Sequence, residues 1–297
     1  MIELRQISKY FGKQCAVSDL DLHVPKGEIF GLLGHNGAGK RTAIGMMLGQ
    51  VWPTRGEIRI CGHDVTRVRQ KALQNVGAIF ETPVFYDFLS GWKNLEILTH
   101  YSAPTPKARI HEVLEWVGLS GREKSKVKTY SHGMRARLAL AQALLPKPEL
   151  LILDEPSDGL DPEGIHEMRE TILRLQRELG LTILLSSHLL NEVEQLCTRI
   201  AVMNKGKKVF EGKISEARGQ KNWVRIRVGS FAEASRRLLE WKLIEEVREG
   251  QFITLAEGIS TDQVVKRLVE DGMPLFEIAV VEQTLEDFYL SLMKGSR

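Results

Sequence analysis

The sequence predicts an α/β fold with a parallel central sheet, an inserted helical subdomain and a small α+β domain that follows it. Continuous apolar runs, such as 29–33 and 150–153, alternate with segments of helical periodicity through about residue 215. Such runs are typical of parallel strands that are covered on both faces by helices. A polar stretch at 216–222 then precedes a different pattern of short strands and amphipathic helices. We therefore predict a first domain over residues 1–218 and a second over 219–297.

Each element of the first domain follows from its local pattern. Asp161 is a good N-cap residue, and Pro162 suits the first turn of the helix that it would open. The predicted elements are a strand at 28–33, a helix at 40–48, a mostly helical subdomain over about 83–145, strands at 150–153 and 182–185, and between those two strands a helix at 162–178.

The second domain is predicted to be ferredoxin-like, because its elements follow the order β-α-β-β-α-β with a final helix. Ser260 and Gln263 have the spacing of a capping box, which predicts a helix start. The predicted elements are strands at 224–228, about 243–247, 252–255 and about 275–280, and helices at 231–239, from 260 to near 272, and from Thr284 onward.

Composition narrows the classes of function. The formal charge is only +3, so there is no electrostatic reason to expect a nucleic acid as partner. Cys15, Cys61 and Cys197 are dispersed and lack C-x-x-C spacing, which fits a reducing cytoplasm better than a disulfide framework. No run of about 18 apolar residues occurs, so a separate polypeptide would have to supply any membrane-spanning part.

The segment Gly34–Lys40 reads G-x-x-x-x-G-K and lies between a predicted strand and a predicted helix. This context identifies a phosphate-binding loop, in which glycines let backbone N–H groups surround phosphate oxygens and Lys40 reaches the β- and γ-phosphates. The pattern then requires Ser or Thr as a Mg²⁺ ligand, but position 41 is Arg. The predicted phosphate-binding residues are Gly34, Asn36, Gly37, Ala38, Gly39, Lys40, Arg41 and Thr42.

Two carboxylates, Asp154 and Glu155, follow the apolar run at 150–153. At the carboxyl end of a strand beside a phosphate loop, Asp154 is placed to hold Mg²⁺, directly or through water. Glu155 is placed to polarise an attacking water.

A short block at 130–134, Tyr-Ser-His-Gly-Met, precedes a helical pattern upstream of this carboxylate pair. Ser131 and Gly133 would lie at a helix N-terminus, where N–H groups and the helix dipole favour an anion. The block resembles the signature sequence of ATP-binding cassette (ABC) ATPases, usually Leu-Ser-Gly-Gly-Gln, with departures at Tyr130, His132 and Met134. The form found here is similar to that of drug- and peptide-exporter subunits.

The resemblance implies an ABC-type P-loop nucleotide-binding domain that takes ATP and Mg²⁺ and works as a head-to-tail dimer. The partner cassette would be an identical copy or a second, different cassette. A transmembrane permease subunit would hold the dimer on the cytoplasmic face of the membrane. Within the same cassette, the resemblance implies that Phe11 stacks on adenine, with Tyr10 as the alternative, that Thr42 faces the α-phosphate and that His188 contacts the γ-phosphate. It also implies that Glu81 replaces a Gln that ligates Mg²⁺. Across the dimer, Ser131 and Gly133 would hold the γ-phosphate of the opposite site, and Asp161 would contact that site.

Arg41 leaves two alternatives open. In the first, its side chain swings aside, Glu81 and Asp154 hold Mg²⁺ with water, and hydrolysis survives at a reduced rate. In the second, the guanidinium takes the place of the metal by pairing with Glu81, Asp154 or the phosphates. Coulomb repulsion between two close cations favours the second. Thr42 does not replace the lost ligand, because adjacent helical residues point about 100° apart.

The sequence thus predicts an ATPase subunit of an ABC exporter, with turnover impaired by Arg41. The alternative is a regulatory module that binds ATP and dimerises without significant hydrolysis. A nucleic-acid-associated cassette is disfavoured, because the chain has no long coiled-coil insertion, zinc module or second cassette.

Overall fold

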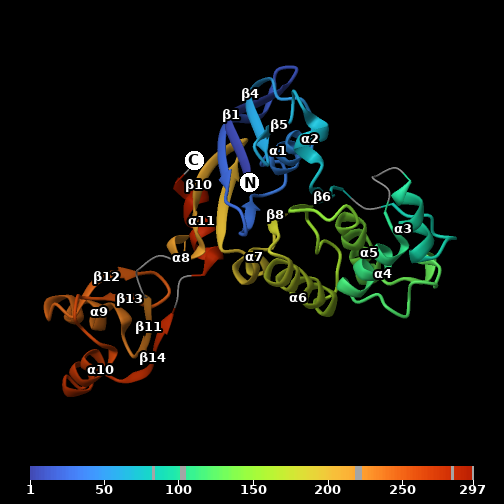
Figure 1. Ribbon diagram of the computed structural model, residues 1–297. Coiled ribbons are helices and arrows are strands. Elements are labelled where there is room, and N and C mark those ends of the chain that lie inside the picture. The colour runs from blue at the N-terminus through green and yellow to red at the C-terminus, as the bar shows by residue number, and fades with distance from the viewer. Residues whose placement is uncertain (82–83, 101–104, 218–222, 282–283, 296–297) are drawn as a thin grey trace. The chain divides into compact units, whose positions relative to one another are not determined.

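The computed structural model describes residues 1–297 except 82–83, 101–104, 218–222, 282–283 and 296–297 (Figure 1). These residues divide into two units, Met1–Ile214 and Ser215–Arg297, with the short helix α8 (Ile214–Ala217) at the division. The boundary predicted at 218/219 lies outside the described residues, as do Thr82 and Pro83 at the predicted start of the helical subdomain.

The first unit is built on two sheets. Six strands form the central sheet in the order β10-β9-β3-β8-β7-β6, and all neighbouring pairs are parallel except β9 with β10. Its strands are β3 (Ile29–Leu33), β6 (Val76–Ile79), β7 (Leu150–Asp154), β8 (Thr182–Ser187), β9 (Arg199–Asn204) and β10 (Lys207–Lys213). Every residue of β3, β7 and β8 is buried, as their apolar runs predict.

A second, antiparallel sheet in the order β2-β1-β4-β5 was not anticipated from the sequence. It consists of β1 (Ile2–Phe11), β2 (Gln14–Val24), β4 (Arg55–Ile60) and β5 (His63–Asp64). Phe30 of the central sheet, Ile7 of this sheet, and Met46 between them belong to one buried cluster. The apolar core therefore joins the two sheets around the helix that follows β3.

Helices surround the central sheet, and Figure 1 shows α3, α4 and α5 grouped on one side of the unit. These three helices occupy the chain between β6 and β7, where the sequence predicts a helical insertion. Ser131 caps α5 and Asp161 caps α6 through side-chain oxygens that accept backbone N–H bonds. The helices are α1 (Lys40–Met47), α2 (Arg69–Leu73), α3 (Gly91–Thr99), α4 (Lys107–Trp116), the 3₁₀ turn η1 (Val127–Thr129), α5 (His132–Leu144), α6 (Pro162–Leu179) and α7 (Leu190–Leu196).

The second unit has one antiparallel sheet in the order β12-β13-β11-β14. Val224, Ile253 and Leu268 lie in its buried cluster, and Ser260 with Gln263 forms the predicted capping box. Its elements are β11 (Trp223–Val228), α9 (Phe231–Glu240), β12 (Ile244–Arg248), β13 (Phe252–Leu255), α10 (Thr261–Glu270), β14 (Leu275–Val281) and α11 (Leu285–Gly295).

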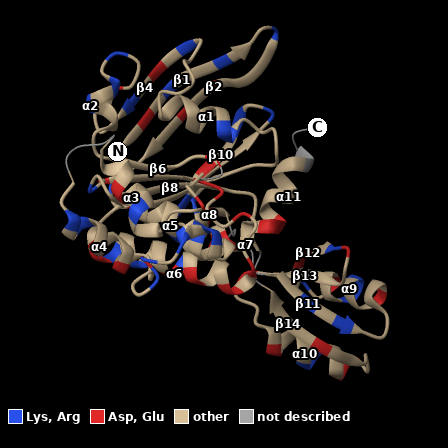
Figure 2. Ribbon diagram, turned by 90° about the vertical axis from the view of Figure 1, so that its right-hand side faces the viewer, with Lys and Arg blue, Asp and Glu red and all other residues tan. Residues whose placement is uncertain are grey.

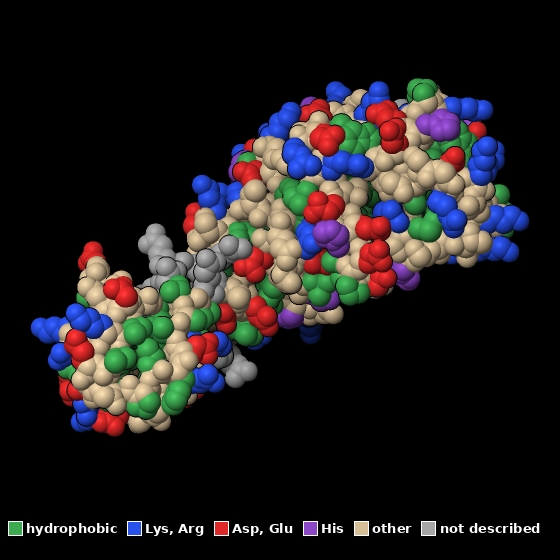
Figure 3. All heavy atoms as spheres, turned by 90° about the horizontal axis from the view of Figure 1, so that it is seen from below, with side chains coloured by type: hydrophobic (Ala, Val, Ile, Leu, Met, Phe, Trp, Pro, Cys, Tyr) green, Lys and Arg blue, Asp and Glu red, His purple; other side chains and the backbone are tan. Residues whose placement is uncertain are grey.

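Charged side chains of both signs are interspersed on the surface. Figure 2 shows both basic and acidic residues distributed over the helices of the first unit. The face presented in Figure 3 likewise has acidic, basic and apolar side chains next to one another. This mixture is what the nearly balanced composition leads us to expect.

Candidate functional site

The loop between β3 and α1 has a backbone that requires glycine. Gly34 and Gly39 have φ values of +155° and +102°. A Cβ on Gly39 would lie 2.6 Å from the carbonyl oxygen of Ala16, and one on Gly34 would lie 2.6 Å from that of Met203. The loop can therefore pack tightly on its neighbours only with these residues.

Helix α1 begins at Lys40 without a side-chain cap and without an acidic residue in its first turn. Among the residues that the structure describes, no side chain caps its first N–H groups, so these can bind an external acceptor, and the helix dipole favours a negative charge at this end. Strand, glycine loop and helix N-terminus together form an anion-binding site.

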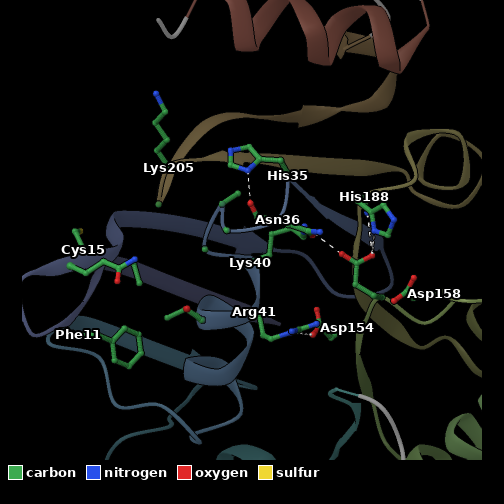
Figure 4. A pocket seen from close by; sticks show the side chains of 18 residues that line it. Phe11, Cys15, His35, Asn36, Lys40, Arg41, Asp154, Asp158, His188 and Lys205 are labelled. Atoms are coloured by element: carbon green, nitrogen blue, oxygen red, sulfur yellow. Dashed lines mark hydrogen bonds and ion pairs between the residues drawn. The ribbon is translucent and has the colours of Figure 1, made fainter.

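A cavity of about 760 Å³ lies in front of this loop (Figure 4). Phe11 lies at one end of the group of residues around it, and Asp154 and His188 lie on other sides. The lining residues predicted from the sequence are Phe11, Asn36, Gly37, Ala38, Gly39, Lys40, Arg41, Thr42, Asp154, Glu155 and His188; those not predicted are Gln14, Cys15, Ala16, His35, Asp158, Lys205 and Gly206.

Lys40 is buried and already has protein partners. Its Nζ donates to the carbonyl oxygen of Gly34 at 2.5 Å and lies 3.4 Å from Oε1 of Glu155. A phosphate that enters the loop must therefore replace these contacts with its own oxygens.

Glu155 links Lys40 to the histidine that follows β8. Nδ1 of His188 lies 2.6 Å from Oε2 of Glu155, and the backbone N–H of His188 donates to the same oxygen at 3.3 Å. Glu155 has a φ of +50°, which is unfavourable for a residue with a side chain and is held by bonds from its N–H to Ser186. The structure thus brings three predicted residues, Lys40, Glu155 and His188, into one connected group.

Asp154 is the most constrained carboxylate of the site. Its Oδ1 accepts a hydrogen bond from Oγ of Ser186 at 2.5 Å, and its Oδ2 accepts one from Nε of Arg41 at 3.0 Å. The Asp154 side chain is 2% exposed, whereas that of Arg41 is 65% exposed. The Asp154 carboxylate raises the pKa of Arg41, and the charges of Glu81 and Glu155 add to the effect, so the guanidinium stays charged.

The arrangement does not fit the Mg²⁺ ion that the family pattern implies. Both oxygens of Asp154 are engaged, and the residue expected to supply a hydroxyl supplies a cation. Glu81 lines a second cavity of about 810 Å³ together with Arg41 and Asp154, but among the described residues no three His, Cys, Asp or Glu side chains are grouped to hold a metal.

Five predicted residues do not line the first cavity, namely Gly34, Glu81, Ser131, Gly133 and Asp161. Ser131 accepts the N–H of Met134 at 3.2 Å, and Asp161 accepts the N–H of Gly164 at 3.0 Å, so both act as helix caps. Neither they nor Gly133 line either cavity. Their expected roles across a dimer stay predictions.

At the far end of the cavity the structure distinguishes two aromatic candidates. Phe11 is exposed and lines the cavity, with Nζ of Lys9 4.9 Å from its ring centre. Tyr10 is also exposed but does not line the cavity. Phe11 is the aromatic that an entering ligand would meet.

Sequence reasoning missed Ser186, although it holds both Asp154 and the N–H of Glu155. It is paired with Asp154 in the register of β7 and β8. The available signal was a serine two positions before His188, at the end of an apolar strand.

Comparisons with known proteins agree with this architecture. Residues 17–158 match the family described as ABC transporter. An uncharacterized ABC transporter ATP-binding protein, YhcH of Bacillus subtilis, is 40% identical over 98% of this chain and 95% of its own length. The bacitracin transport ATP-binding protein BcrA of Enterococcus faecalis is 37% identical over 99% of this chain and 97% of its own.

Solved structures share the fold of the first unit. The ATP-binding subunit of an ABC transporter is 30% identical, with a TM-score of 0.65 over 74% of this chain and 92% of that one. A dimeric cassette bound to ADP and Pi has a TM-score of 0.65 at 23% identity, over 72% of this chain and 99% of its own. Among the described residues, no helix combines the length and apolar character needed to cross a membrane. On the strength of the near full-length relatives, the chain belongs to the ATP-binding proteins of ABC transporters.

Proposed function

We propose that this chain is the ATP-binding subunit of an exporter of the drug or peptide-antibiotic type, and that Arg41 impairs its ATP turnover. Relatives named for bacitracin transport align over nearly the whole chain, which supports the exporter class. The Arg41–Asp154 ion pair is the observation that carries the impaired turnover.

In this proposal, Phe11 stacks on adenine, the loop at 34–39 and the N-terminus of α1 bind the phosphates, and Lys40 exchanges Gly34 and Glu155 for phosphate oxygens. Glu155 orients the attacking water, and His188, which it contacts, positions the γ-phosphate. Ser131, Gly133 and Asp161 act on the site of a second cassette in a head-to-tail dimer, since they lie outside their own cavity.

The proposal also covers the helical subdomain, the C-terminal unit and the location of the subunit. We assign α3, α4 and α5 to the helical subdomain, and the C-terminal unit to a ferredoxin-like fold on the basis of its strand order. The subunit would lie on the cytoplasmic face of the membrane and be held there by a separate permease.

Arg41 impairs turnover for an electrostatic reason. A divalent cation placed about 4 Å from the guanidinium would meet a repulsion of about 8 kcal/mol at an effective dielectric constant of about 20. The ion would also have to displace Arg41 from Asp154. The chain therefore lacks a low-energy place for Mg²⁺ while Arg41 keeps this position.

The test is the Mg²⁺-dependent ATPase rate of the protein and of its Arg41→Thr variant, with Glu155→Gln in the variant as the blank. We expect Arg41→Thr to raise the rate at least about tenfold, because it restores a hydroxyl and frees Oδ2 of Asp154. Equal rates would refute the role given to Arg41.

The second candidate is a regulatory module that binds ATP and dimerises without turnover. The paired state of both cations, Lys40 with Glu155 and Arg41 with Asp154, favours it. It predicts ATP-dependent dimerisation with negligible hydrolysis even in the Arg41→Thr variant. Size-exclusion chromatography with and without ATP, combined with the rate measurement, distinguishes the two candidates.

A further inference from the structure

The guanidinium of Arg41 is anchored at one position and open at the others. Only its Nε has a hydrogen-bond partner among the described residues, namely Asp154. A guanidinium carries five N–H donors, so the four on its two terminal nitrogens remain available. Arg41 lines both the cavity at the glycine loop and the neighbouring one, and its side chain is mostly exposed.

These free donors lie beside other groups suited to phosphate. Arg41 is the second residue of α1, directly after Lys40, and the uncapped N-terminus of this helix lines the same cavity. The planar fork of Arg matches two phosphate oxygens at once, with charge-assisted hydrogen bonds. One anchored guanidinium can thus neutralise phosphate charge at a place from which it excludes a metal.

The charges near Arg41 do not prevent this use. Arg41 and Glu81, which both depart from the family pattern, carry opposite charges, and Glu81 lies close enough to favour the charged form of Arg41. Asp154 is neutralised by Arg41, and Glu155 lies against Lys40. A nucleotide therefore meets two cations whose side chains are already held at the cavity wall.

We propose that this site binds the metal-free nucleoside triphosphate, with the Arg41 guanidinium in the place that a divalent cation takes in other cassettes. The inference rests on the proposed nucleotide site and goes further, because it names the ionic form of the ligand. Mg²⁺ competes with this binding, since it both complexes the nucleotide and meets the charge of Arg41.

The experiment is isothermal titration calorimetry of the full-length protein with ATP, in EDTA and in excess Mg²⁺. We expect ATP in EDTA to bind at least as tightly as in Mg²⁺. In Arg41→Thr the order should reverse, with binding in EDTA at least about tenfold weaker than in Mg²⁺. Arg135→Gln is the matched control: it removes a cation that lines only the second cavity and pairs with Asp87, and it should keep the behaviour of the parent protein.

The outcomes separate this inference from the proposed function. If the parent protein binds ATP about tenfold more tightly with Mg²⁺ than in EDTA, the inference is wrong and the nucleotide site stands. If neither the parent nor Arg41→Thr binds ATP under either condition, while circular dichroism shows both folded, the proposed function itself is overturned. Arg41→Lys keeps the charge but not the fork. Retention of metal-free binding by this variant would show that charge alone suffices, and would overturn the fork geometry.

Discussion

Ser186 should be the residue on which the geometry of Asp154 depends. Its Oγ donates to Oδ1 of Asp154 at 2.5 Å and accepts the N–H of Glu155 at 3.1 Å, and it is completely buried. Ser186→Ala would leave one oxygen of a buried carboxylate without its donor. Because hydrogen bonds to charged groups contribute about 1.5–3 kcal/mol, we expect a loss of about 2.5 kcal/mol in the free energy of unfolding.

The neighbouring Ser187 provides the control. It is also buried, and its Oγ accepts one neutral bond, from the N–H of Leu189 at 3.0 Å. Ser187→Ala should therefore cost only about 1 kcal/mol. The two variants remove the same atom from adjacent buried positions. Ser186→Ala loses a bond to a charged carboxylate and one from a backbone N–H, whereas Ser187→Ala loses only a bond from a backbone N–H.

Urea denaturation followed by circular dichroism measures the difference. With a slope of about 3 kcal/mol per molar urea, the midpoint should fall by about 0.8 M in Ser186→Ala and by about 0.3 M in Ser187→Ala. Equal shifts, or a smaller shift for Ser186, would show that the carboxylate does not depend on this hydroxyl.

Three further predictions follow from contacts around the site. Phe11→Ala should weaken ATP binding about tenfold in calorimetry, since stacking on a base contributes about 1–3 kcal/mol, whereas Tyr10→Ala should leave it unchanged. Cys15, exposed at the cavity, should be alkylated by iodoacetamide and protected by ATP, as peptide mass spectrometry would show. Cys197 should stay unmodified until the protein unfolds, because burial raises the pKa of its thiol. Burial also raises the pKa of Glu192, so the stabilising contribution of this residue is present below its unfolded-state pKa and is lost as pH rises through its folded-state pKa. Glu192→Gln should therefore raise the melting temperature by about 2 °C or more at pH 7, and should not raise it below about pH 4. An equal gain at both pH values would contradict this origin.

The sequence was most informative where a local rule determines the backbone. The glycine loop, the N-cap at Asp161 and the capping box at Ser260 and Gln263 lie where their patterns predict. In each case a side chain or a positive φ value is required within a few residues, so no knowledge of distant contacts is needed.

Long-range pairing was not accessible in this way. The alternation of β1 is interrupted after Leu4, where the register shifts and Gln6 takes a φ of +48°. A bulge moves the following side chains to the other face, so period-2 analysis loses the strand. The role of Ser186 was not predicted for a related reason. Its contact with Asp154 depends on the register between β7 and β8, which cannot be derived from the sequence of either strand alone.

For Arg41, a local motif identified the position, but a long-range contact determined the conformation of the side chain. Its position in a phosphate-loop motif made it conspicuous, but the motif could not specify the direction of a long, flexible side chain. The Arg41 side chain turns towards Asp154, because among the described residues Asp154 is the nearest buried carboxylate that has no other positive charge beside it. Glu155 lies against Lys40, whereas Ser186 gives Asp154 a hydrogen bond but no positive charge. The Asp154 side chain is 2% exposed, and a buried carboxylate is stable only when it is paired, so the Arg41 side chain turns towards it. The carboxylate that the resemblance to ABC ATPases implies for Mg²⁺ thus holds Arg41 in place.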